Sequence, residues 1–232
     1  MSETADPAND PDQNPLSDSQ RRAAVIDLLG VLAYGELIAF ERMASDASMA
    51  PGIAEEAALG HMAVAEFGHF VALRDHLTSL GADPAEAMSP FIEPLDAFHD
   101  STTPADWLEG LVKAYVGDGF AADFYREVAE FIDDESTRKL ILAALADTGH
   151  AQFVVEQVRA AVAADASVAG RLALWARRLV GEALVQAQRV AVDRDALAAL
   201  IVGSGDLVKV GELLARLTQR HTERMESLGL RA

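Results

Sequence analysis

Apolar residues recur every three or four positions along most of the chain, the spacing that places them on one face of an α-helix. The residues in these stretches are mainly alanine, leucine, glutamate and arginine, which favour helix. No alternating run of β-branched residues is long enough to indicate a strand. The sequence therefore predicts an all-α protein. Six long helices are expected, with a short one at 194–202, and the long ones span 19–46, 52–80, 104–132, 134–163, 167–191 and 206–227.

The connections between these helices predict how they are arranged. Pro51-Gly52 separates the first two helices and Asp133-Asp134 separates the third and fourth, and such short connections favour antiparallel neighbours. The second and third helices are separated by a long segment that includes a loop from Pro90 to Pro104, which is long enough for a crossover. Two helical hairpins joined by a crossover form a four-helix bundle over 19–163. Residues 164–232 are expected to form additional C-terminal helices that pack on this bundle.

The first 18 residues differ from the rest of the chain, because they contain three prolines and five acids and almost nothing apolar. This composition predicts a disordered acidic tail. The segment lacks the basic start and apolar stretch of a signal peptide, and no uninterrupted apolar run elsewhere reaches the roughly 20 residues of a membrane span. We therefore expect a cytoplasmic protein that does not interact with a membrane.

The apolar stripe of each bundle helix is interrupted near its middle by a carboxylate. In the first helix, for example, the stripe passes from Leu32 through Glu36 to Phe40. In the second and fourth helices a histidine follows the acid after three residues. The interrupting residues are Glu36 in the first helix, Glu66 and His69 in the second, Asp118 in the third, and Asp147 and His150 in the fourth.

Burying an unpaired carboxylate is costly, so four of them on core faces require a shared compensation. These stripes contain no lysine or arginine, and we therefore expect metal ions to supply the positive charge. Residues three apart lie on one side of a helix, so each acid and the histidine after it can bind the same metal ion. One acid from each of two helices, with acid-x-x-His from each of the other two, is the ligand pattern of dinuclear metal bundles.

The two halves of the predicted bundle repeat this pattern at similar spacing. Gly35-Glu36 corresponds to Gly117-Asp118, and the acid-x-x-His segments follow 30 and 29 residues after these acids. A single acid-x-x-His occurs by chance in many helices, but two of them at matching distance from an upstream acid indicate a site. The six residues are therefore the candidate metal ligands, and the sequence assigns no catalytic residue.

Three alternatives remain open at this point. Asp123 could replace Asp118 as the ligand from the third helix. Aspartate is one methylene shorter than glutamate, so Asp147 could fail to bridge, which would leave one tight metal site and one weak or empty site. The bundle could also have kept the fold and a hydrogen-bonded polar core without any metal.

The matched set of ligands resembles that of the ferritin-like superfamily. The stretches that begin at Trp107 (WLEGLVKAYVGDG) and at His221 (HTERMESLG) resemble more specifically an actinobacterial group similar to MiaE, the non-haem di-iron hydroxylases of tRNA 2-methylthio-isopentenyladenosine. The resemblance covers about residues 20–230 and implies two iron ions that activate O2 to hydroxylate a C–H bond. At Asp118 and Asp147 the chain departs from the glutamates expected of true hydroxylases.

Composition and charge limit which metal ligands and which binding partners are compatible with the sequence. The chain has no cysteine, so thiolate sites are excluded, and carboxylate and imidazole ligands suit iron or manganese. Its 37 acidic and 19 basic residues give a net charge of −18, which disfavours a polyanion such as tRNA. Arg216, Arg220 and Arg224 could still form a local basic face, or be paired with acidic neighbours.

Together these observations predict a ferritin-like dinuclear metal protein and a candidate O2-dependent hydroxylase, which would use O2 and a substrate that the sequence does not identify. The alternative is a non-catalytic metal-handling protein or a metal-free scaffold. We expect a homodimer.

Overall fold

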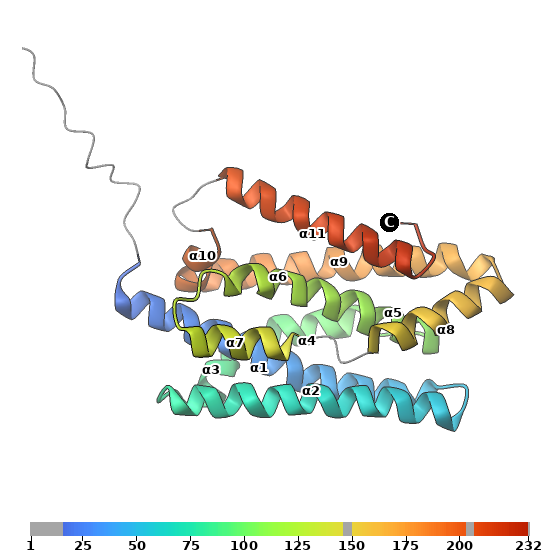
Figure 1. The fold of residues 1–232 in the computed structure, drawn as a ribbon, viewed down its shortest axis with the longest axis horizontal. Helices are drawn as coiled ribbons and strands as arrows, with labels where there is room; N and C mark the ends of the chain where they lie inside the picture. Colours follow the sequence, from blue (N-terminus) through green and yellow to red (C-terminus); the bar gives the residue numbers. More distant parts are fainter. Residues whose placement is uncertain (1–15, 146–149, 203–206, 232) are drawn as a thin grey trace, which may run out of the picture.

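The computed structural model describes residues 16–145, 150–202 and 207–231, and in these ranges every regular element is a helix (Figure 1). The prediction of an all-α fold is confirmed. The predicted tail lies outside the described residues up to residue 15. Its last residue, Asp18, already belongs to the first helix, which is capped by Ser17: the Ser17 hydroxyl accepts from the Gln20 N–H, and the Gln20 side chain accepts from the Ser17 N–H.

The first hairpin is formed by α1 (Asp18–Asp46) and α2 (Ile53–Ser79), with the short 3₁₀ turn η1 (Ala47–Met49) between them. The crossover that follows is helical, so the predicted loop from Pro90 to Pro104 is wrong. It contains α3 (Pro84–Met88), the 3₁₀ turn η2 (Ser89–Phe91) and α4 (Ile92–Ser101). Its prolines misled the prediction because Pro84 and Pro94 occupy first turns of helices, where the missing N–H has no helical partner to lose.

The third predicted helix consists of three consecutive elements, α5 (Trp107–Val112), the π-helical turn η3 (Lys113–Asp118) and α6 (Gly119–Ala129). The fourth is described as two helices, α7 (Glu135–Ala144) and α8 (His150–Ala164). Residues 146–149, between α7 and α8, lie outside the described residues. π turns are rare and often occur at functional sites, because they change the direction of side chains along a helix.

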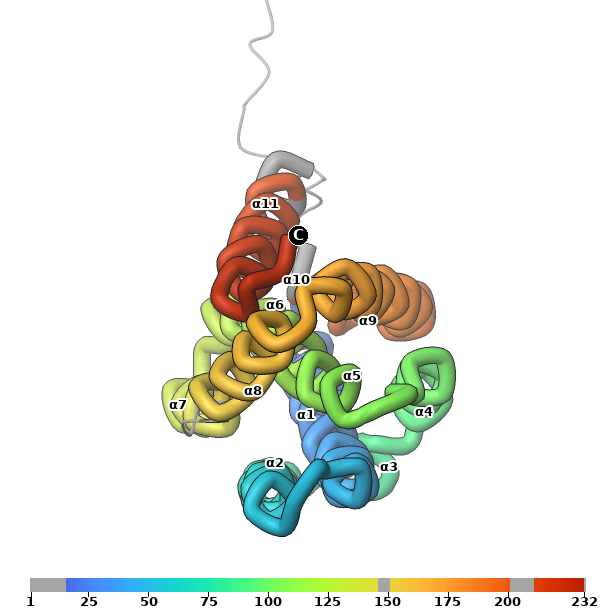
Figure 2. The backbone as a smooth tube through the Cα atoms, turned by 90° about the vertical axis from the view of Figure 1, so that its right-hand side faces the viewer, coloured from blue at the N-terminus to red at the C-terminus, as the bar shows by residue number. Residues whose placement is uncertain are grey.

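Three further helices follow: α9 (Ser167–Asp193), α10 (Asp195–Val202) and α11 (Leu207–Ser227). Helix α9 packs along α4, α5 and η3, α10 packs against α1, and α11 packs mainly on α6. The end-on view shows that α9 and α11 lie on the opposite side of the molecule from α2 (Figure 2).

The buried apolar residues form two clusters that follow one another along the bundle. One contains the N-terminal half of α1 and the C-terminal half of α2, with Leu28 and Leu73 among its members. The other contains the opposite halves of the same helices, with Met43 and Leu59, and extends to α5, α8 and α9. The middle of α1 and α2 therefore passes between two apolar cores.

The segment Asp18–Met49 is long and apolar enough to cross a membrane, as judged by length and composition alone. In the structure this segment is the core helix of the bundle. Leu28, Leu29 and Ala33 are fully buried, and α1 packs against α2, α3 and α10.

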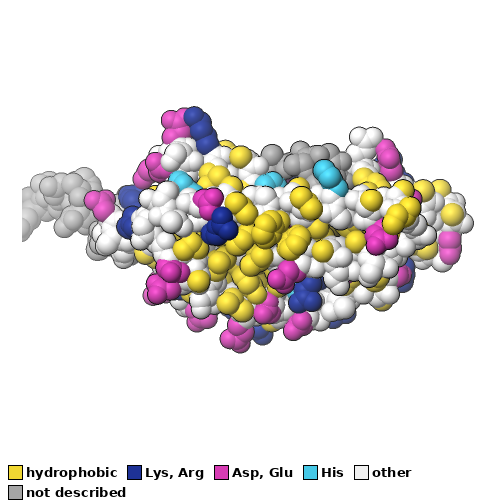
Figure 3. Space-filling model, turned by 90° about the horizontal axis from the view of Figure 1, so that it is seen from below, with side chains coloured by type: hydrophobic (Ala, Val, Ile, Leu, Met, Phe, Trp, Pro, Cys, Tyr) yellow, Lys and Arg dark blue, Asp and Glu magenta, His cyan; other side chains and the backbone are white. Residues whose placement is uncertain are grey.

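Helix α2 forms the lower edge of the molecule in Figure 1, and some of its apolar side chains point outward. Val64 and Phe67 are exposed, and the Phe67 ring contacts those of Phe40 and Phe70. The view from below shows a band of apolar side chains across this face, with acidic side chains around it (Figure 3).

Gly30 provides a test of how closely the crossover packs on α1. A Cβ at this position would lie well inside van der Waals contact of the Ala87 carbonyl oxygen, a backbone atom of α3 that cannot rotate away. We expect Gly30→Ala to lower the free energy of unfolding by about 1–3 kcal/mol, as overpacking does, in urea denaturation. The control is Gly60→Ala in α2, where a Cβ would meet no atom within 4 Å. This control should stabilise the protein by up to about 1 kcal/mol. Equal effects would contradict the close contact.

Candidate metal centre

Three of the predicted ligands converge between the two apolar clusters. Glu36 comes from α1, and Glu66 and His69 come from one side of α2. One atom from each lies within 4.8 Å of the others. The His69 Nδ1 is 3.2 Å from a Glu66 carboxylate oxygen and 3.5 Å from a Glu36 carboxylate oxygen. We call these three residues the carboxylate–histidine cluster.

The three residues of the cluster shift one another's pKa values. Burial raises the pKa of Glu36 well above its ordinary value, and the nearby Glu66 raises it further, while His69 opposes the shift. The hydrogen bonds that His69 donates to the carboxylates of Glu36 and then Glu66 raise the pKa of His69 to about 10, although burial opposes this. Without a metal, an imidazolium therefore lies between the two carboxyl groups.

Asp118 lies at the end of η3 and faces the same region. Its side chain is accessible to solvent and lines the same cavity as Glu36, Glu66 and His69. Burial raises its pKa well above the ordinary value, the charge of Glu66 raises it further, and Lys113 opposes both. Asp118 is therefore close enough to Glu66 for their charges to interact, although it is not part of the three-residue group.

For Asp118, the expectation that no lysine compensates the acids is wrong. Lys113 begins η3 and is only 6% exposed; its Nζ donates to the Thr102 carbonyl at 2.8 Å and lies 5.6 Å from the centre of the Phe98 ring. Burial lowers its pKa to about 8, while Asp46 and Asp118 favour its charge. The sequence prediction missed Lys113 because it assumed α-helical periodicity through the π turn. The lysine inside the apolar run LVKAYV was the available signal.

The other acid-x-x-His pair stays a prediction. Asp147 lies outside the described residues. His150 is the first residue of α8, but its side chain is likewise outside the described part of the chain. The structure thus brings together Glu36, Glu66 and His69 near Asp118, and leaves the remaining two candidates untested.

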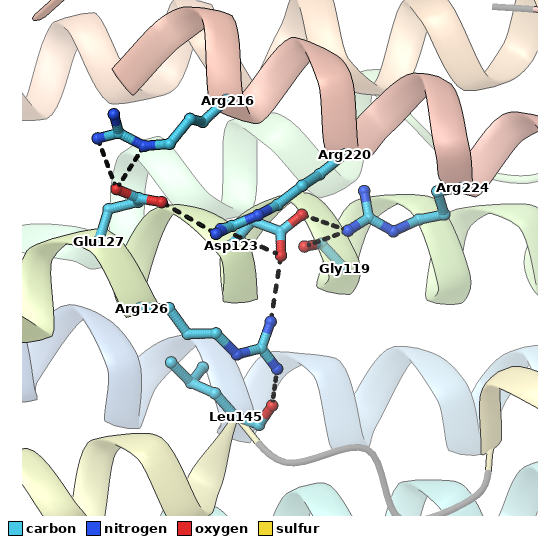
Figure 4. A network of polar contacts seen from close by, with 8 residues as sticks. All are labelled: Gly119, Asp123, Arg126, Glu127, Leu145, Arg216, Arg220 and Arg224. Carbon is cyan, nitrogen blue, oxygen red and sulfur yellow. Dashed lines mark hydrogen bonds and ion pairs between the residues drawn. The ribbon is translucent and has the colours of Figure 1, made fainter. Parts of the chain in front are cut away.

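Asp123, the alternative to Asp118, is bound in a different environment. It accepts hydrogen bonds from Arg126 and Arg224 and lies 3.7 Å from Arg220 (Figure 4). One turn further along α6, Glu127 pairs with Arg216 at 2.7 Å and with Arg220 at 3.1 Å. Both acids are nearly buried. Of the two candidates on this helix segment, only Asp118 lies near the cluster.

The three arginines of α11 are thus engaged by acids of α6. Arg224 also donates to the Gly119 carbonyl, and it can lie this close only because residue 119 has no Cβ, which would overlap the guanidinium. This arginine ladder, formed by Arg216, Arg220 and Arg224, fixes α11 on the bundle. Arginines paired in this way are less available for phosphate than a free basic face would be.

The cluster lines a cavity of about 520 Å³. Glu36, Glu66, His69 and Asp118 all line it, as do Tyr115 and Tyr125, the two tyrosines that flank Asp118 in the sequence. Burial raises the pKa of Tyr125, and the charge of Glu36 raises it further. The tyrosine ring therefore lies near the cluster as well as on the cavity wall.

Comparison with known proteins agrees with this architecture. A family model described as "Ferritin-like domain, actinomycetes" matches residues 19–204. The match includes every candidate ligand and ends before α11. Among curated proteins, none matches the chain.

The cluster predicts how the stability of the metal-free protein depends on pH. His69 has a higher pKa in the folded protein than the ordinary 6.5, so its contribution is complete below pH 6.5 and is lost as the pH rises through about 10. We expect His69→Gln to flatten the decline in unfolding free energy between pH 6.5 and 10, measured by urea denaturation with a chelator. The unmodified protein, measured over the same pH range, is the reference, and an equally steep decline in His69→Gln would contradict this role of His69.

The arginine ladder predicts a second effect on stability. Asp123→Asn removes a nearly buried charge that faces three guanidinium groups. We expect a loss of about 1–3 kcal/mol in unfolding free energy, less than for a fully buried pair because Arg126 and Arg220 are partly exposed. Limited proteolysis should also cut α11 faster. Glu223→Gln, at an exposed position of α11, should change neither measurement. Unchanged protection in Asp123→Asn would contradict the role of the ladder.

Proposed function

Because the chain belongs to the ferritin-like domain family of actinomycetes, we propose that its carboxylate–histidine cluster is part of a dinuclear metal centre. The observation that carries this proposal is the convergence of Glu36, Glu66 and His69 between two apolar cores, on the wall of a cavity. Acids in such a position are costly unless a cation compensates them.

The donor set fits a metal ion. Two carboxylates and an imidazole within 4.8 Å of one another provide oxygen and nitrogen ligands, which suit iron or manganese. Glu36, Glu66 and His69 would hold one ion. Asp118, with Asp147 and His150 as predicted from the sequence, would hold the other. A bound ion would displace the proton that His69 carries in the metal-free protein.

We propose that the centre serves an O2-dependent hydroxylase or related oxidoreductase. Two iron ions, when bound, would supply the activation of O2. The chain's own residues would hold the ions, separate them from bulk water by two apolar clusters, and leave a cavity open beside Asp118 for a substrate. This is the chemistry that the resemblance to the MiaE-like group implies.

A tRNA substrate is less well supported than the oxidative chemistry. The net charge of −18 repels a polyanion, and the three arginines that could form a basic face are paired with Asp123 and Glu127. The cytoplasmic location and the homodimer stay expectations from the sequence.

A second candidate function is a metal-free scaffold or a non-catalytic metal-handling protein. The observation that favours the scaffold is the positive charge already present: His69 lies between two acids, and Lys113 acts on Asp118. These two cations compensate part of the buried negative charge without any metal.

Metal content decides between these functions. We expect the protein purified from its native host to contain close to two iron or manganese ions per chain, by elemental analysis. Addition of iron(II) and then O2 to the metal-free protein should produce a new absorption band. Glu66→Gln keeps the shape of the side chain but removes its charge, and should lower metal affinity by about tenfold or more.

The matched control is Glu41→Gln, at an exposed position of α1 five residues beyond Glu36. This variant should bind metal as the unmodified protein does. Little metal in the native protein, unchanged by Glu66→Gln, would contradict the metal centre and favour the scaffold.

A further inference from the structure

We propose that the cavity beside the cluster binds an uncharged, predominantly hydrocarbon molecule, which is the substrate class of the site. This inference rests on the proposed function, since it takes the cluster as the reacting end of the cavity. Its volume of about 520 Å³ lies within the range of about 300–1,000 Å³ that is typical of small-molecule sites.

The walls of the cavity are apolar over most of their area. They are contributed by helices far apart in the sequence, from α1 and α4 to α9, α10 and α11. Representative side chains are Val31, Leu95, Phe124, Val190, Leu197 and Leu217. Such walls favour an apolar ligand, whose transfer out of water is favourable. They offer few hydrogen-bond partners to a polar ligand.

The charged residues on the wall argue against an ionised ligand. Arg126 and Arg224 both line the cavity, but Arg126 donates to Asp123 and the Leu145 carbonyl, and Arg224 donates to Asp123 and the Gly119 carbonyl. The Asp123 carboxylate already balances positive charge of both guanidinium groups, although Arg224 Nη1 has no hydrogen-bond partner in the described part of the chain. At the other end the acids of the cluster repel an anion, and they are themselves engaged by His69.

The wall formed by α9 and α11 contains two large apolar side chains that are accessible to water. Leu184 of α9 and Leu214 of α11 both line the cavity, yet they remain 37% and 49% exposed. Helix α11 packs mainly on α6, and side chains of α11 and α9 line the same cavity. Large apolar side chains that stay in contact with water inside a cleft indicate a surface that a ligand covers.

The proposal also gives the ligand an orientation. Its hydrocarbon body would lie along α9 and α11, and one end would reach the polar layer, where Asp118 faces the cavity and Tyr125 lies near Glu36. A single hydroxyl or C–H group would then be presented to the metal centre. No charged group of the ligand is required for binding.

The test uses the full chain without metal and the neutral fluorescent probe N-phenyl-1-naphthylamine. We expect saturable binding of one probe per chain with a dissociation constant on the order of 10 μM. 1-Dodecanol should displace the probe, and dodecanoate, which has the same chain length and a negative charge, should be at least about tenfold weaker.

Two matched variants locate the site. Leu184→Asp places a charge on the cavity wall and should weaken probe binding by about tenfold or more. Val185→Asp places the same charge on the next residue of α9, which is 43% exposed and does not line the cavity, and should leave binding unchanged. Circular dichroism of both variants checks that they remain folded.

The outcomes separate this inference from the metal centre. Absence of probe binding, equal competition by dodecanoate, or equal effects of the two variants would overturn the inference, even if the protein binds two metal ions. Probe binding with the expected variant effects would support it, even if elemental analysis finds no metal. In that case the cavity would be a binding site for apolar molecules without an oxidative function.

Discussion

The burial of negative charge at the middle of the bundle is the constraint on which the rest of the structure depends. Glu36 and Glu66 interrupt the core helices where one apolar cluster ends and the other begins. Neither cluster could extend through this level without leaving the carboxylates unpaired. His69, Lys113 and, as we propose, metal ions are different means of satisfying the same requirement.

This division of the core explains why the cavity lies where it does. Apolar side chains pack tightly within each cluster, with many residues fully buried. At the level of the acids the helices instead carry polar groups and the small residues Gly35 and Gly117, which fill less space. The polar layer and the cavity are therefore two aspects of one interruption in packing. Helices α9 and α11 enclose it from outside the four bundle helices.

The sequence predicted the ends of most helices within a few residues, because their apolar stripes are long and regular. It also identified Glu36, Glu66 and His69, which lie on two uninterrupted helices where the periodicity of 3.6 residues holds. The helices of the crossover were missed because prolines in the first turn of a helix and prolines in a loop look alike in sequence. Lys113 was missed because the stripe was traced with α-helical spacing through a π turn.

The arginine ladder shows a different limit of sequence reasoning. The spacing of Arg216, Arg220 and Arg224 places them on one face of α11, and both a basic surface and an ion-paired one were compatible with that spacing. Only the position of α11 beside α6 shows that Asp123 and Glu127 face these arginines. Charge patterns within one helix carry no information on the neighbouring helix.

The direction in which Asp118 points depends on the number of residues in the π turn η3 as well as on which residues they are. A π turn accommodates one residue more than the α-helical turn it replaces, so α5 and α6 are out of register with each other by about 100° of helix rotation. Deletion of a single residue from Lys113–Asp118 would restore continuous α-helix. Either α6 would then turn Asp118 away from the cluster, or α5 would turn Trp107 and Leu111 out of the core. The position of this carboxylate thus depends on the number of residues in the π turn. Substitutions leave that number unchanged, so substitution experiments alone would not reveal this dependence.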